Sequence, residues 1–169
     1  MIGNDVVAGN FYYCVNHWFP HQSKSFYNSV DSHDGYHQYS YVIDGSCTGE
    51  FRDNANRDPV RIITSDSLNN SFLDHNDLPK HETVYTDTGV TMMFFSPIDK
   101  SKPIKVEIIN SGTHTITATD KRITIVSIIG PVQANDKELI TMQYAAVFQG
   151  KTAELVIPEN GVCALVSYA

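Results

Sequence analysis

Apolar and polar residues alternate along most of the chain with a period of two. Segments such as VYTDTGVTMMFF, RITIVSII and VCALVSY are rich in β-branched and aromatic residues, and Gly, Pro, Asn or Asp stand at their borders. Alternation with such borders is typical of short β-strands separated by turns. No stretch carries the apolar stripe and caps of an amphipathic helix. The sequence therefore predicts an all-β protein with roughly ten to twelve strands, as in sandwiches and barrels.

A stretch with two prolines and two lysines, SPIDKSKP, favours a junction between two halves. We expect a first half at residues 1–97, a junction at 98–103 and a second half at 104–169, within one compact unit. Segment 37–45 (HQYSYVIDG) aligns with segment 142–150 (MQYAAVFQG), sharing Gln, Tyr, Val and Gly in register. This faint repeat favours a duplicated arrangement.

Two polar stretches, residues 15–29 and 65–79, are predicted to be long loops. Loops of this length in a compact domain are more often functional or mobile than incidental. We expect His17, Trp18 and His21 to line the mouth of a barrel, where the indole supplies apolar or stacking surface. The alternative for these side chains is simple packing.

Composition limits the classes of partner. Of the 169 residues, 41% are hydrophobic and 18% are charged, which suits a globular protein rather than a disordered one. The net charge of −7 argues against binding to polymeric nucleic acid or to an anionic membrane. A small anionic molecule can still bind in a local basic pocket.

The three cysteines, Cys14, Cys47 and Cys163, are widely spaced and form no C-x-x-C motif. This pattern favours reduced, buried thiols, with one disulfide plus a free thiol as the alternative. The first residues lack the features of a signal peptide, and no apolar run has the length of a membrane span. We expect a cytoplasmic protein, located in the host cytoplasm if it is viral.

Histidines are concentrated in the first half, and only His114 lies beyond residue 81. Within DSHDGYHQ (residues 31–38), Asp31 and His33 are two residues apart and would share one face of a strand. The Asp-Gly pair that follows favours a hairpin turn, and the returning strand would carry His37 and Gln38 to the same end. Such a cluster indicates either a metal site or a hairpin with polar ends.

The same residues resemble the motifs of the cupin family. The first cupin motif, G-x5-H-x-H-x3,4-E-x6-G, is echoed by Asp31-x-His33-x4-Gln38-x6-Gly45, or by Asp31-x-His33-x3-His37. The second, P-x-G-x2-H-x3-N, is echoed by Pro79-Lys80-His81, and VTMMFFSP after it is similar to the strand that closes many cupin barrels. Asp replaces the first His, and Gln or His replaces the Glu.

The resemblance implies a jelly-roll barrel, also called a double-stranded β-helix, in a bicupin-like duplicated form. It implies a divalent transition metal, namely Fe, Mn, Ni or Zn, held by Asp31, His33, His37 (or Gln38) and His81. Imidazole and carboxylate ligands suit these ions, and an open position would let a substrate bind. The matching positions of the second half contain no histidine, so that half is expected to be scaffold or dimer surface.

Three functions remain open. The first is a cupin-like protein that binds a small polar or anionic molecule, with enzymatic turnover as an option. The second is a module that sequesters a nucleotide or metabolite without turnover, such as a viral protein, and the third is a structural β-sandwich of an assembly. A homodimer or higher homo-oligomer is expected. For the first function, Tyr36 and His17 are the predicted proton-transfer residues, and Trp18, His21, Gln38 and Tyr39 are predicted to contact the ligand.

Overall fold

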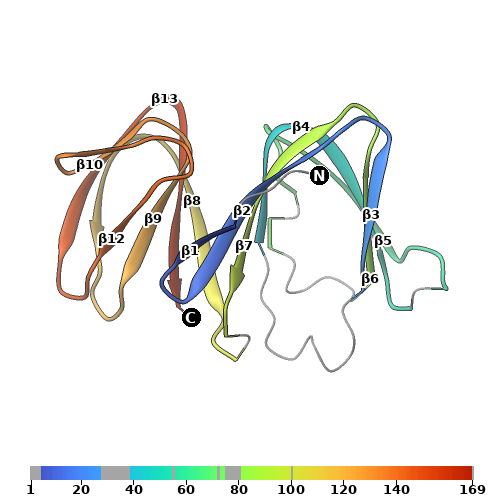
Figure 1. Ribbon diagram of the computed structural model, residues 1–169, viewed down its shortest axis with the longest axis horizontal. Helices are drawn as coiled ribbons and strands as arrows, with labels where there is room; N and C mark the ends of the chain where they lie inside the picture. Colours follow the sequence, from blue (N-terminus) through green and yellow to red (C-terminus); the bar gives the residue numbers. More distant parts are fainter. Residues whose placement is uncertain are drawn as a thin grey trace. The chain divides into compact units, whose positions relative to one another are not determined.

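The computed structural model describes residues 5–27, 39–54, 56–71, 73–74, 81–99 and 101–168. All regular elements in these ranges are β-strands, thirteen in number, so the prediction of an all-β fold is confirmed (Figure 1). No helix in these ranges is long and apolar enough to cross a membrane. The chain divides into two compact units, residues 1–103 and 104–169.

The first unit contains a seven-stranded antiparallel sheet. Its strands run in the order β1-β2-β7-β4-β6-β3, and β5 also pairs with β4. Their bounds are β1 (Asp5–Ala8), β2 (Phe11–Trp18), β3 (Gln22–Tyr27), β4 (Tyr39–Arg52), β5 (Arg61–Asp66), β6 (His81–Thr86) and β7 (Val90–Pro97).

Strand β4 connects the two parts of this sheet because it is long and bends. Residues 39–45 pair with β7, whereas residues 46–52 pair with β5 and β6. The pairing register shifts between Val42 and Asp44, which marks a bulge. Gly45 follows with a φ of +78°, and a Cβ there would lie 2.2 Å from the carbonyl oxygen of Gly89. Only glycine therefore fits at the bend.

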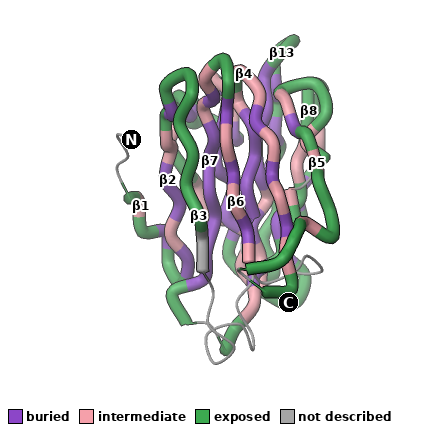
Figure 2. Tube along the Cα trace, turned by 90° about the vertical axis from the view of Figure 1, so that its right-hand side faces the viewer, coloured by how far each residue is buried: buried purple, intermediate pink, exposed green. Residues whose placement is uncertain are grey.

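A buried apolar cluster covers one face of this sheet, which we call the inner face; the opposite face is the outer face. The outer face is also buried around Tyr13 and Phe95, whose ring centroids lie 6.0 Å apart. Strand β7 is consequently buried along nearly all its length (Figure 2). The inner cluster comprises Cys14, Trp18, Val42, Cys47, Val84, Val90, Met92 and Phe94.

The second unit contains six strands in the order β11-β10-β13-β9-β12, and β8 pairs with β13. Strand β13 changes register between Ile157 and Val162; its first part pairs with β10 and its second part with β9. A core that includes Ile125, Leu155 and Cys163 is enclosed by these strands. Their bounds are β8 (Ile104–Thr117), β9 (Ile123–Ile129), β10 (Val132–Ala134), β11 (Lys137–Leu139), β12 (Tyr144–Val147) and β13 (Thr152–Tyr168).

The prediction of a long loop over residues 15–29 is wrong. Strand β2 continues to Trp18 and β3 begins at Gln22, so only residues 19–21 connect them. Strand β3 stands last in the strand order of its sheet and pairs with β6 alone among the described strands. An edge strand of this kind tolerates the polar residues that suggested a loop.

Replacing Gly45 by alanine should destabilise the first unit by about 3 kcal/mol or more, because a strained φ and a backbone clash act together. Gly150→Ala is the matched control: φ there is +74°, but nothing lies within 4 Å of the added Cβ. The control should lose only about 1–2 kcal/mol, the cost of the left-handed conformation. Urea unfolding followed by far-UV circular dichroism measures both, and the fluorescence of Trp18 reports on the first unit. Equal losses in the two variants would contradict the close approach.

Candidate functional site

Half of the predicted site residues can be placed. The described ones are His17, Trp18, His21, Tyr39 and His81. The predicted residues that lie outside the described ranges are Asp31, His33, Tyr36, His37 and Gln38.

Trp18 and His17 are neighbours on β2 and therefore point to opposite faces. Trp18 is 3% exposed and belongs to the inner cluster. His17 is exposed on the outer face, where its Nδ1 lies 2.9 Å from Oγ1 of Thr91 and its ring meets Phe19 edge-on at 5.0 Å. The structure does not bring the imidazole and the indole together.

Tyr39 also lies on the outer face. Val42 belongs to the inner cluster, so Ser40 shares its face and Tyr39 points the other way. The register agrees, because Tyr39 stands opposite Phe95, which stands opposite Tyr13 on the next strand. The buried Tyr39 is thus part of the outer-face packing.

His21 and His81 likewise lie away from Trp18. His21 sits in the turn before β3 with a φ of 63°, and its side chain is 82% exposed, with Nδ1 4.0 Å from Asp87 Oδ1. His81 begins β6 opposite Arg52. Because Val84 faces inward, His81 faces outward and Glu82 inward.

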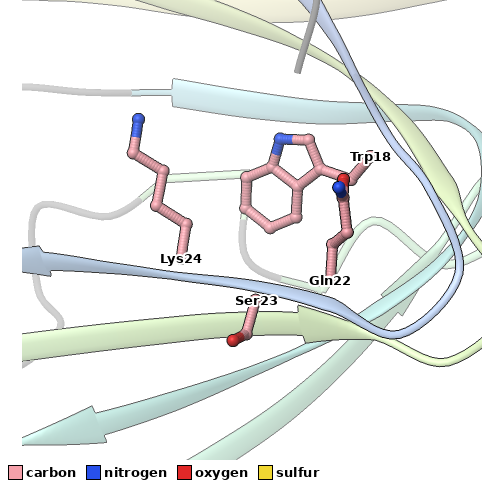
Figure 3. Close-up of a pocket in the computed structure, with 4 residues that line it drawn as sticks. All are labelled: Trp18, Gln22, Ser23 and Lys24. Atoms are coloured by element: carbon pink, nitrogen blue, oxygen red, sulfur yellow. The ribbon is translucent and has the colours of Figure 1, made fainter.

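Strand β3 contributes two inner-face residues that the sequence prediction missed. Gln22 stands opposite Thr86 and Lys24 opposite Val84, whose side chains are both buried. Together with Trp18 and Ser23 they line a pocket of about 220 Å³. Figure 3 shows Gln22 and Lys24 on either side of the indole, whereas the Ser23 hydroxyl points away. The alternation in QSKS, interpreted as a strand, was the signal for this arrangement.

Charge reaches the inner face from two strands. Glu82 is 9% exposed and stands opposite Phe51. Burial, with a smaller contribution from the Glu82 carboxylate, raises the pKa of the Cys47 thiol to about 12. Burial also raises the pKa of Cys14 to about 11, and the positive charge of Lys24 opposes that rise. The inner face is thus largely apolar, with a buried carboxylate at Glu82 and an exposed cation at Lys24 on the edge strand β3.

A metal site is not formed by the described residues alone. In the part of the chain that the structure describes, no group of three or more His, Cys, Asp or Glu side chains could hold an ion. Of the four ligands implied by the motifs, only His81 is described, and it faces outward.

Comparison with solved structures gives the fold. The chain is similar to a cupin 2 conserved barrel domain protein from Leptotrichia buccalis, with 11% identity, 99% of this chain and 88% of that chain covered, and a TM-score of 0.54. It is also similar to a variant of Bacillus subtilis oxalate decarboxylase, with 7% identity, 97% of this chain and 71% of that chain covered, and a TM-score of 0.61. A third similar structure is HutD from Pseudomonas fluorescens SBW25, with 11% identity, 95% of this chain and 79% of that chain covered, and a TM-score of 0.58.

No protein-family model and no curated protein sequence matches the chain. Identities this low establish the fold alone. The chain has the fold of the cupin superfamily, as the motif resemblance implied: an all-β structure of curled antiparallel sheets.

The three thiols should be unreactive in the folded protein, since all are free and buried. Burial raises the pKa of Cys163 to about 12, as it does for Cys47. At pH 8 we expect labelling by Ellman's reagent to be about 100-fold slower in the native protein than in urea. In the unfolded chain the thiols have their ordinary pKa of 9.0, so they ionise at lower pH than the buried thiols do. The stability that the buried thiols contribute is therefore complete below about pH 9 and declines above it. Rapid native labelling of any thiol would contradict this burial.

Proposed function

We propose that the first unit binds a small polar molecule with an anionic group in the pocket beside Trp18. The observation that carries this proposal is the convergence of Lys24, Gln22 and Trp18 on one face of the sheet. A cation, an amide and an indole around one small pocket are the groups that small-molecule sites use to fix orientation.

Each of the three side chains has a distinct role. The Lys24 ammonium would donate charge-assisted hydrogen bonds to a carboxylate. The Gln22 Oε1 accepts a hydrogen bond of 2.9 Å from the Phe19 backbone N–H. That bond orients the amide, so its N–H₂ group is the part offered to a ligand. Trp18 would supply an apolar wall for the ligand's carbon atoms.

Size and charge limit the ligand class. A volume of about 220 Å³ lies below the range of drug-sized sites, so we expect a ligand of only a few carbon atoms. Glu82 lies on the same face as Lys24, displaced by two positions along β6. A second negative charge on the ligand near Glu82 would be repelled, so the anionic group would lie at the Lys24 end.

A metal-dependent activity is the second candidate, because the solved structures with this fold include an oxalate decarboxylase. Its ligands would come chiefly from Asp31, His33 and His37, which lie outside the described residues. Binding without turnover and a structural role in an assembly stay as hypotheses. The homodimer or higher homo-oligomer also stays a prediction, which light scattering after size exclusion would test.

Replacing Lys24 by methionine should weaken ligand binding about 10- to 100-fold, since a charged hydrogen bond is lost at similar side-chain length. A thermal-shift panel of formate, acetate, oxalate, malonate and citrate selects the tightest binder, and titration calorimetry then gives its Kd. Lys102→Met is the charge-matched control, because Lys102 is exposed and pairs with Asp99 at 3.2 Å. The proposal fails if no panel member stabilises the protein, or if both variants bind as the parent does.

Protein purified without an affinity tag should contain about one equivalent of Fe, Mn, Ni or Zn per chain if the metal hypothesis holds. Elemental analysis measures this content, and His33→Ala should lose most of it. His114→Ala is the control, because this exposed histidine lies on β8, where its Nε2 is 3.2 Å from the Asn110 carbonyl oxygen. Less than about a tenth of an equivalent in the parent protein would exclude the metal hypothesis. The proposal that the Lys24 pocket binds an anionic ligand does not depend on this result.

A further inference from the structure

The second unit also contains a pocket, which is larger than the pocket beside Trp18. It measures about 500 Å³, within the range of small-molecule sites. Strand β12 forms one wall, and the turn between β10 and β11 forms another. Its lining residues include neither histidine nor cysteine.

The floor of this pocket is apolar and belongs to the core of the second unit. Ile125 and Val147 are 0% and 5% exposed. Three alanines, Ala134, Ala145 and Ala153, complete the floor, and all three belong to or pack against the core cluster. Their small side chains, in a core otherwise built from Ile, Val and Leu, account for the free volume.

The rim is aromatic and polar. Tyr144 is 39% and Phe148 62% exposed, and Arg122 Cζ lies 5.7 Å from the Phe148 ring centroid. Asp136 and Lys137 lie at the β10–β11 turn and carry opposite charges. The charged side chains at this rim are exposed or paired with an aromatic ring, whereas exposed rings near an apolar floor suit a flat apolar molecule.

Both walls are held in place without a ligand. At the β10–β11 turn, Asn135 donates its backbone N–H to the Glu154 carbonyl and accepts the Glu154 N–H on Oδ1, both at 2.8 Å. After β12, the backbone N–H of Lys151 donates to the Phe148 carbonyl at 3.0 Å. A preformed pocket costs a ligand less ordering entropy than one that must close.

We propose that this pocket is a second ligand site, which takes an uncharged or weakly polar molecule with one or two fused rings. The ring system contacts the apolar lining of β12, and any polar substituent reaches Lys137 or Asp136 at the rim. This site is independent of the anion pocket of the first unit and differs from it in ligand class.

The fluorescent probe N-phenyl-1-naphthylamine tests this proposal with the full chain, because it is neutral and gains fluorescence in apolar sites. The parent protein should bind one equivalent saturably. Ala145→Leu should weaken binding more than tenfold by filling the floor. Phe148→Ala should weaken it about fivefold by removing one aromatic wall.

Two controls keep the result specific. Ile140→Ala removes an apolar side chain that is 54% exposed and does not line the pocket, so it should bind the probe as the parent does. Lys24→Met should also leave probe binding unchanged, which separates this site from the first. If the Ala145→Leu variant does not melt cooperatively, the Phe148→Ala variant alone tests the proposal, because the exposed Phe148 side chain contributes little to folding. No saturable binding by the parent, or parent-like binding by Phe148→Ala, would overturn the proposal.

Discussion

The close approach of two backbones at the bend of β4 is the constraint on which the first unit depends. Gly45 sits against the Gly89 carbonyl with a positive φ, directly after a bulge. This bend lets one strand pair with β7 through its first part and with β5 and β6 through its second. Without this bend, the two parts of the sheet would not share one inner face. The side chains of Gln22 and Lys24 on β3 would then not lie on the same face as Trp18.

Strand alternation then decides which side chains can meet. Four residues share the parity of the inner face: Trp18 on β2, Gln22 and Lys24 on β3, and Glu82 on β6. Trp18 and Glu82 are buried, whereas Gln22 and Lys24 are exposed on the edge strand. His17 is one residue out of phase and faces outward. A shift of a single residue along a strand thus separates a pocket residue from a surface residue.

Both units are built from antiparallel strands, but their interiors differ. The first places a lysine and a glutamine beside an indole, whereas the pocket lining of the second includes alanines and exposed aromatic residues. Gly45 and Gly150, which match in the repeat of segments 37–45 and 142–150, both have positive φ. Their surroundings differ, because only Gly45 is in close contact with another backbone.

The sequence by itself determined the all-β class, the strand-rich segments, the buried free thiols and the cupin resemblance, because alternation and turn residues act locally. It did not determine the candidate pocket. Lys24 was hidden in a polar stretch interpreted as a loop, and its face is defined only by pairing with β6, sixty residues away in the chain. Tyr39 and His81 were grouped with Trp18 by their chemistry, yet the parity of their strands turns them outward. Tertiary pairing decided the site, since local sequence sets the period of a strand but not which of its two faces becomes the interior.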